Sequence, residues 1–266
     1  MPKLSVIIIA KNEAVNIRAC IDTVSWADEI IVVDAGSTDD TISCAREMGA
    51  QVYVHADWPG FGPQKNRALD YATGEWVFSI DADERVTHEL RAEIEQAMCV
   101  AEVDGYYCPR LSQFCGKFIH HSGWYPDYVL RLFKRGAGRF SDSLVHESVL
   151  LAGRAIKLTS PLLHYSYLSK KDVERKVEHY STAAAQQMFE AGKESGYMDA
   201  VLRGGWAFVR TYMLRLGVLD GVAGYAIACM NARTTYLKYR KLTALHSNRP
   251  KNDNCSRGGA ENAEKN

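Results

Sequence analysis

Short apolar runs alternate with helix-like stretches along the first hundred residues of this chain. The expected strands are Leu4–Ala10, Glu29–Asp34, Gln51–His55 and Trp76–Ile80; the expected helices are Asn16–Val24, Ser37 or Thr38 to about Met48, Gln64–Ala72 and Thr87 to about Ala101. Strands that are apolar throughout are typical of a sheet covered on both faces. The alternation therefore predicts an α/β fold with a mostly parallel, doubly wound sheet.

The pattern changes after Asp104-Gly105. Short strand-like pieces are expected at Tyr106–Ser112, Phe118–His121, Val129–Lys134 and Ala155–Leu158, and helices at Lys170–Lys193, Asp199–Leu216 and Asp220–Leu242. The short pieces are separated by Gly, Pro and Asp, which predicts an antiparallel extension of the sheet and an irregular wall over its edge. Residues 246–266 are rich in Asn, Gly, Ser, Lys and Glu and are predicted to be disordered.

Composition narrows the classes of protein that fit. The formal net charge is zero, so no global field favours binding to nucleic acid. The seven cysteines are odd in number and form no Cys-x-x-Cys pair, which indicates reduced thiols rather than a disulfide framework or a zinc site. No secretory signal and no apolar run of about 20 residues are recognisable, so we expect a cytoplasmic protein.

Polar residues follow three of the predicted strands, in Ala10-Lys11-Asn12-Glu13, in Asp34-Ala35-Gly36-Ser37-Thr38 and in Asp81-Ala82-Asp83-Glu84. The carboxyl ends of parallel strands share one edge of a sheet, so these loops should be neighbours. On an extended backbone Asp81 and Asp83 would point the same way and converge, as ligands for Mg²⁺ or Mn²⁺. The alternative is local: Asp34 and Thr38 would cap a helix, and Glu13 would favour a helix N-terminus.

Four segments in combination resemble the family-2 inverting glycosyltransferases, which have the GT-A fold. The segments are Ser5–Glu13, Ile30–Asp39, Lys65-Asn66-Arg67-Ala68 and Asp81-Ala82-Asp83, and the resemblance covers residues 3–165. Further segments are similar to bacterial lipopolysaccharide core beta-1,4-glucosyltransferases: Gly62–Asn66, Arg131-Leu132-Phe133, Val145-His146-Glu147 and Leu216–Gly221. The resemblance implies a GT-A catalytic domain at 1–165, with a nucleotide-binding half at 1–104 and an acceptor half at 105–165.

The same resemblance implies a site for a UDP-sugar. Its expected members are Ala10, Asn12, Glu13, Asp34, Ser37, Lys65, Asp81 and Arg131, with Asp83 as the ligand of a divalent cation, Mg²⁺ or Mn²⁺. Asp34 would accept a hydrogen bond from the uracil imide, and Asp81 would hold ribose or sugar hydroxyls. Lys65 would meet the diphosphate or else lie on a solvated helix face. Arg131 would pair with the diphosphate or bridge strands.

The implied reaction transfers glucose from UDP-glucose to an inner-core heptose of lipopolysaccharide, with inversion. Inversion needs a general base for the acceptor hydroxyl. Glu147 is the first candidate and Asp127 the second, while His146 would contact phosphate or orient Glu147. Trp124, Tyr125 and Tyr128 would stack on sugar rings or form core under the acceptor loop.

Residues 166–245 form a helical region that is basic and aromatic. Between Gly196 and Leu245 seven Lys or Arg residues stand against two acids. Such helices fit a bilayer interface and a lipid-linked glycan acceptor, which predicts a peripheral protein on the cytoplasmic face of the inner membrane. The alternative is a helical pair that packs on the catalytic domain or forms a dimer.

Three rival functions stay open from the sequence. One is a family-2 transferase with another donor sugar or glycan acceptor. Another is a nucleotidyltransferase, which normally has a Gly-rich, basic loop where this chain has Lys11-Asn12-Glu13. The third is an inactive, membrane-bound protein that binds sugar nucleotides.

Overall fold

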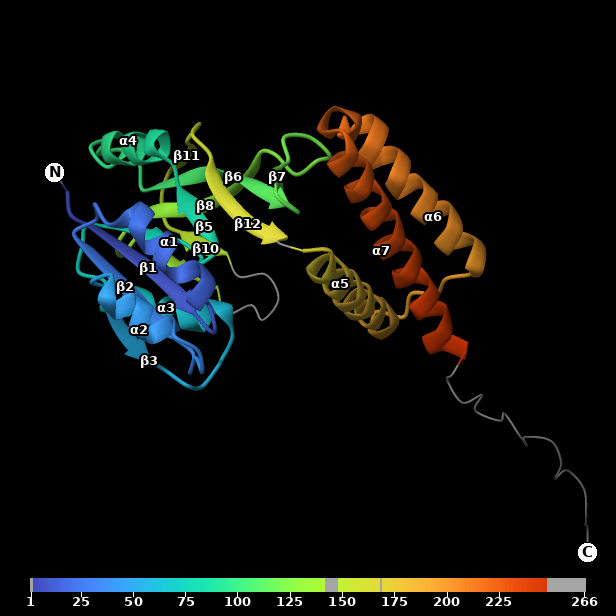
Figure 1. Cartoon of the computed structure of the whole chain (residues 1–266), viewed down its shortest axis with the longest axis horizontal. Coiled ribbons are helices and arrows are strands. Elements are labelled where there is room, and N and C mark those ends of the chain that lie inside the picture. The colour runs from blue at the N-terminus through green and yellow to red at the C-terminus, as the bar shows by residue number, and fades with distance from the viewer. Residues whose placement is uncertain (1, 142–147, 168, 248–266) are drawn as a thin grey trace, which may run out of the picture. The chain divides into compact units, whose positions relative to one another are not determined.

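A mixed sheet organises the computed structural model, which describes residues 2–141, 148–167 and 169–247 (Figure 1). The strands are β1 (Leu4–Ala10), β2 (Glu29–Asp34), β3 (Gln51–Val54), β4 (Trp76–Ser79), β5 (Glu84–Val86), β6 (Gly105–Phe114), β7 (Lys117–Phe118), β8 (Asp127–Lys134), β9 (Gly138–Phe140), β10 (Val149–Leu151), β11 (Ala155–Lys157) and β12 (Leu162–Tyr167). The main sheet has the order β3-β2-β1-β4-β8-β6-β12-β5, with β7 and β11 paired to β6, and β9 pairs with β10 separately.

Strand direction divides the sheet into two halves. β1 runs parallel to β2 and β4, and β2 runs parallel to β3. β8 then pairs antiparallel with both β4 and β6, and β12 lies between β6 and β5. The predicted parallel half is confirmed. The predicted antiparallel extension holds for β8 with β4 and β6 and for β12 with β5, whereas β11 and β12 both pair parallel with β6.

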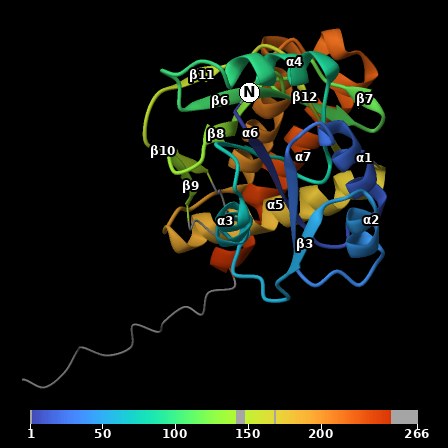
Figure 2. The ribbon, with the colours of Figure 1, turned by 90° about the vertical axis from the view of Figure 1, so that its left-hand side faces the viewer.

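Helices cover both faces of the parallel half. They are α1 (Ala14–Val24), α2 (Thr41–Glu47), α3 (Phe61–Tyr71) and α4 (His88–Ala97). Ile8 and Phe78 pack with α1, α2 and α4 in one buried cluster, and Ile7 and Val77 pack with α3 in another. Figure 2 shows α1 and α2 on one side of the strands and α3 on the other. This two-sided burial explains why the strands are apolar throughout.

Several predicted boundaries differ from the structure. The expected strand Phe118–His121 is wrong, because only Lys117–Phe118 pairs with β6. Neither Ser37 nor Thr38 caps α2, which begins at Thr41. Helix α3 begins at Phe61, earlier than predicted, since a proline at residue 63 is tolerated in a first helical turn.

The last part of the chain is helical. It contains α5 (Lys170–Glu190), α6 (Tyr197–Val209), a π-helical turn η1 (Arg210–Leu214), a 3-10 turn η2 (Gly217–Asp220) and α7 (Val222–Ser247). Helix α7 therefore starts two residues after the predicted start at Asp220 and continues past the predicted end at Leu242 to Ser247. The prediction of disorder is wrong for His246 and Ser247, which are helical. The rest of the segment predicted to be disordered lies outside the described residues.

The chain divides into two compact units. One contains Met1–Val173 and Val209–Ala228, and the other contains Glu174–Phe208 and Cys229–Asn266. The sheet, its covering helices and both short turns thus belong to the first unit. The domain boundary expected after residue 165 stays a prediction. Across the three described ranges, none of the helices has the length and apolarity needed to span a membrane.

Candidate functional site

The loops after β1 and β2 are joined at the edge of the sheet. Asn12 has a positive φ of 56°, which asparagine tolerates better than most residues. Its backbone N–H donates to Ser37 Oγ at 2.8 Å, and its Oδ1 accepts the Thr38 N–H at 2.8 Å. The prediction that these two strand ends are neighbours holds.

Asp34 organises its own loop. The side chain is fully buried, and Oδ1 accepts the N–H groups of Gly36 at 2.9 Å and Ser37 at 2.7 Å. The Ser37 hydroxyl donates to Oδ2. Ala10, at the end of β1, pairs in register with Asp34 and is also buried. Asp34 therefore shapes a turn and does not cap a helix.

Glu13 stands at the start of α1, facing the other loops. Its N–H donates to Thr41 Oγ1 at 2.8 Å, and its carboxylate accepts the Asn16 amide at 2.8 Å. Partial burial raises the pKa of Glu13, and the nearby carboxylates of Asp83 and Asp39 raise it further. Glu13 is thus brought close to the carboxylates of two other loops.

Asp81 lies between two buried cations. Lys65 Nζ, on α3, is 2.9 Å from Asp81 Oδ1, and Arg131 Nη2, on β8, donates to Asp81 Oδ2. Burial alone would raise the pKa of Asp81, but Arg131 and Lys65 outweigh it and hold that pKa well below its usual range. Lys65 is only 3% exposed, so the alternative of a solvated helix face is wrong.

Glu84 completes this cluster from β5. Its carboxylate is fully buried; Oε1 accepts from Arg131 Nη2 at 2.6 Å and Oε2 accepts the Asp81 N–H at 3.0 Å. Burial raises the pKa of Glu84, and the charge on Asp81 adds to this effect against the opposing Arg131. Arg131, on β8, therefore bridges to Glu84 on β5, in agreement with one of the two roles predicted for it. Glu84 was not among the predicted site residues.

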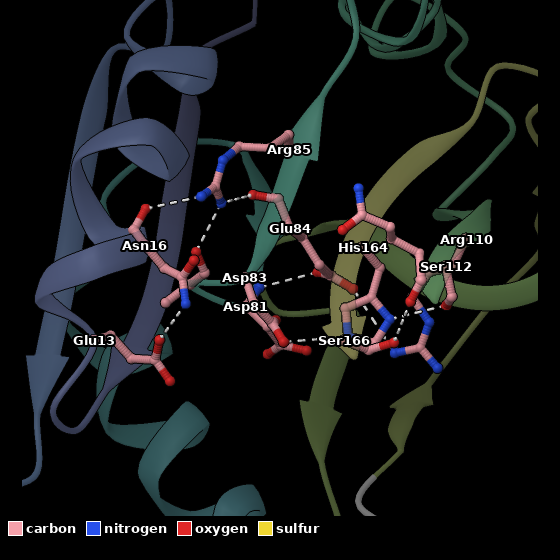
Figure 3. Close-up of polar contacts among 12 residues, drawn as sticks. Glu13, Asn16, Asp81, Asp83, Glu84, Arg85, Arg110, Ser112, His164 and Ser166 are labelled. Carbon is pink, nitrogen blue, oxygen red and sulfur yellow. Dashed lines mark hydrogen bonds and ion pairs between the residues drawn. The ribbon is translucent and has the colours of Figure 1, made fainter. Parts of the chain in front are cut away.

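Asp83 has a different partner, which the sequence did not reveal. Its Oδ2 lies 3.3 Å from His164 Nε2 on β12, and its carbonyl accepts the Tyr165 N–H at 2.8 Å. Ser112 Oγ lies 3.0 Å from the other ring nitrogen, Nδ1 of His164. Figure 3 shows Asp81 and Asp83 between α1 and the strand that carries His164.

The extended backbone from which the convergence of Asp81 and Asp83 was predicted is wrong. Strand β4 ends at Ser79, and the Glu84 N–H donates to the Asp81 carbonyl at 2.9 Å, which closes a turn. The alternation of an extended strand does not apply in a turn, so the two carboxylates take separate partners. Within the described ranges, no three His, Cys, Asp or Glu side chains are grouped to hold a metal ion. Asp83 and His164, 3.3 Å apart, carry side chains of the types that ligate divalent cations.

A cavity of about 350 Å³ opens beside the cluster. Its lining includes Lys65, Asp81, Arg110, Tyr128 and Arg131. Three of these five side chains are cationic, and Lys65 and Arg131 are held in place by Asp81. The arrangement is a preformed, basic pocket of the kind that binds phosphate groups.

One predicted general-base candidate lies within the described residues. Asp127 begins β8, and its Oδ2 accepts both Nε of Arg110 at 3.0 Å and Nη2 at 2.6 Å. Arg110 was not predicted as a site residue. His146 and Glu147 lie outside the described residues, and their roles stay predictions.

The aromatic residues of the predicted acceptor wall have different environments. The Trp124 ring packs against Phe114 at 5.8 Å and Tyr167 at 5.3 Å between centroids, which fits the core alternative. The Tyr125 ring meets His120 edge to face. Tyr128 instead lines the cavity, with Lys157 Nζ 4.3 Å from its ring centroid.

Known proteins similar to this chain carry related descriptions. The lipopolysaccharide core biosynthesis glycosyltransferase LpsC of Rhizobium meliloti is 31% identical over 266 residues, covering 93% of this chain and 95% of that protein. An uncharacterized glycosyltransferase of Rickettsia felis is 30% identical over 258 residues, covering 91% and 90%.

A solved structure shows the same fold. The mannosyltransferase PcManGT of Pyrobaculum calidifontis, in complex with GDP-Man and Mn²⁺, superimposes with a TM-score of 0.51 at 18% identity, covering 92% of this chain and 84% of that chain. The architecture is that of the GT-A glycosyltransferases. The family model for glycosyl transferase family 2 matches residues 5–146. With that match and with LpsC similar along most of its length, the chain belongs to glycosyl transferase family 2.

Proposed function

We propose that this enzyme transfers glucose from UDP-glucose to an inner-core heptose of lipopolysaccharide, with inversion at the anomeric carbon. The observation that carries the proposal is the basic cavity beside the Lys65–Asp81–Arg131 cluster, at the carboxyl edge of the parallel strands. The choice of glucose as the donor sugar and of heptose as the acceptor rests on the resemblance to core glucosyltransferases. The similarity to LpsC supports a lipopolysaccharide core as the acceptor class.

The donor would lie across the joined loops and the cavity. Ala10, Asn12, Glu13, Asp34 and Ser37 would form the nucleotide pocket, with Asp34 recognising the uracil imide. Lys65 and Arg131 would attract the diphosphate, and Asp81 would hold hydroxyls of the ribose or sugar. Both cations are already ordered by their ion pairs, so little side-chain entropy is lost when an anion binds.

Asp83 and His164 fit a divalent cation. A carboxylate and an imidazole suit Mn²⁺, and a carboxylate suits Mg²⁺, with phosphate oxygens and water as the usual further ligands of such ions. Ser112 fixes the ring of His164 from the opposite side, as partners of metal-binding histidines commonly do. When bound, the cation would neutralise charge on the departing UDP.

The general base is proposed to be Glu147, with Asp127 second. Ser148, which follows Glu147 in the chain, lines the cavity. Arg110 already donates twice to one oxygen of Asp127, which makes that carboxylate the weaker candidate. His146 would contact phosphate or orient Glu147.

The acceptor proposed here is anchored to a lipid. An enzyme that acts on it would work as a peripheral protein on the cytoplasmic face of the inner membrane.

The test measures UDP release from a panel of UDP-sugars, with core oligosaccharide truncated at the inner heptoses and with or without Mn²⁺. We expect release with UDP-glucose that requires acceptor and metal, and a β-linked product by NMR. Equal release without acceptor, or transfer of a different sugar, would contradict the proposal, and pyrophosphate release would indicate a nucleotidyltransferase.

Glu147→Gln tests the base assignment in the same assay. We expect a fall in turnover of roughly 100-fold or more, with UDP affinity unchanged by calorimetry. Asp127→Asn is the comparison variant. Unchanged turnover in Glu147→Gln together with a large loss in Asp127→Asn would transfer the role to Asp127.

A further inference from the structure

The segment that joins α6 to α7 exposes an unusual number of large apolar side chains (orange to red in Figure 1). Six of them lie within Met213–Val222 and are 48% to 87% exposed: Met213, Leu214, Leu216, Val218, Leu219 and Val222. We call these six residues the 213–222 surface. Soluble proteins seldom leave so many neighbouring apolar groups in water unless the surface binds something.

This exposure is built into a well-anchored turn. Asp220 is only 3% exposed, and its carboxylate accepts the His121 N–H at 3.2 Å and the Ser122 hydroxyl at 2.7 Å. The Ser122 N–H donates to the Arg215 carbonyl at 2.8 Å. A Cβ added at Gly224 would lie 1.8 Å from the Gly217 carbonyl oxygen, so the two backbones are in close contact. The polar groups face inward, and the apolar side chains are left outside.

The exposed charges within residues 204–228, the stretch that contains the 213–222 surface, have one sign. Arg210 and Arg215 are both exposed, whereas Asp220, the only carboxylate between residues 200 and 228, is buried. Apolar side chains flanked by cations match the interface of an anionic bilayer. A second copy is a poorer match, since two copies that met through this stretch would both present arginines, and residues 200–228 contain no exposed acid to pair them.

The geometry points to an anionic lipid membrane as the partner of this surface: the six apolar side chains insert into the headgroup region, and Arg210 and Arg215 meet lipid phosphates. This inference rests on the proposed function only for the lipid-linked nature of the acceptor. The loop held by Asp220 runs directly into β8, whose Tyr128 and Arg131 line the cavity. Docking would therefore hold the cavity at a set height above the membrane.

Flotation of the full-length protein with vesicles tests this surface. One vesicle type contains phosphatidylglycerol and phosphatidylethanolamine, and the other contains phosphatidylcholine alone. We expect binding to the anionic vesicles, reduced at least tenfold in Leu214→Glu/Leu219→Glu because burying one leucine is worth about that factor. Val100→Glu is the matched control, since Val100 is 40% exposed and lies outside the surface.

A second variant, Arg210→Gln/Arg215→Gln, leaves the apolar residues in place. It should weaken binding to anionic vesicles about fivefold per arginine, and urea unfolding of each variant confirms that it is folded. Binding of wild type to neither vesicle, or equal flotation of wild type and both variants, would overturn the inference. So would a wild-type dimer, by light scattering, that becomes monomeric in Leu214→Glu/Leu219→Glu.

Calorimetry with UDP and Mn²⁺, without vesicles, separates this inference from the proposed function. Failure of the wild-type protein to float with either vesicle, together with UDP binding, would overturn only the membrane surface. Flotation without UDP binding would overturn only the proposed function.

Discussion

At the scale of single residues, the site is governed by one buried carboxylate, one half-buried carboxylate and two buried cations. Asp81 is shared by Lys65 and Arg131, and Arg131 is shared by Asp81 and Glu84. Each charge taken out of water needs a partner, because an unpaired ion is far too costly to bury. The pairing keeps the cations extended at the cavity, where a phosphate group would meet them.

Glu84→Gln tests the buried pair. Because it leaves Arg131 with one carboxylate fewer in a buried setting, we expect the free energy of unfolding to fall by about 3 kcal/mol in urea denaturation. Glu95→Gln is the matched control, since Glu95 pairs with Arg91 on the surface of α4, and it should change stability by less than about 0.5 kcal/mol. Equal losses in the two variants would contradict this account.

Ser112→Ala tests how the proposed cation is held. Removing the hydroxyl that fixes His164 should weaken Mn²⁺ binding about tenfold, measured by electron paramagnetic resonance with UDP present. Asp83→Asn should weaken it more. Ser25→Ala is the control, because Ser25 lies at the end of α1 and its exposed hydroxyl donates to the Asp22 carbonyl of the same helix. Wild-type Mn²⁺ affinity in Asp83→Asn would remove Asp83 as a ligand.

At the scale of elements, helix α4 positions the strand that carries His164. Glu93 on α4 accepts the N–H groups of Thr159 and Ser160, both at 2.8 Å, just before β12 begins. β12 then pairs with β5 and β6 and brings His164 to Asp83. One carboxylate outside the site therefore helps to set the geometry within it.

Glu93→Gln tests this connection through pH. Partial burial would raise the pKa of Glu93, but the N–H groups of Ser160 and Thr159 outweigh it and lower the pKa below its ordinary 4.5. A lowered pKa adds stability above pH 4.5 that is lost as pH falls through the folded-state pKa. We expect the free energy of unfolding of wild type to exceed that of Glu93→Gln by about 1–2 kcal/mol at pH 7. This difference should disappear as the pH falls below 4.5. A gap of the same size at pH 7 and at acid pH would contradict it.

At the scale of the whole molecule, the first unit encloses two thiols that report on its unfolding. Cys20 and Cys108 are fully buried, whereas Cys99, Cys115 and Cys229 are exposed. Burial raises the pKa of both buried thiols, so neither supplies the reactive thiolate in the folded state.

Labelling with N-ethylmaleimide, followed by peptide mass spectrometry, should show this division. We expect the three exposed cysteines to react in native buffer, and Cys20 and Cys108 to react together at the urea concentration where circular dichroism is lost. If Cys20 were labelled in native buffer as fast as Cys99, the packing of α1 against the sheet would be contradicted.

Predictability from the sequence differed from element to element. The apolar runs at Leu4–Ala10 and Glu29–Asp34 were sufficient to predict parallel strands, and hence the meeting of Asn12 with Ser37. The three-residue β5 is too short to leave a pattern. β12 was missed because most of its side chains are half-buried and do not alternate.

The sequence by itself determined the parallel half of the sheet and the group of loops at its edge, because both follow from local hydrophobic patterns and strand direction. Only the tertiary structure decided that Arg131 joins Asp81 to Glu84, and that His164 faces Asp83. These contacts link residues 47 to 81 positions apart and depend on which strands pair and in what register. The hydrophobic patterns of strands, with a period of two residues, and of helices, with a period of three to four, do not specify which strands pair or in what register.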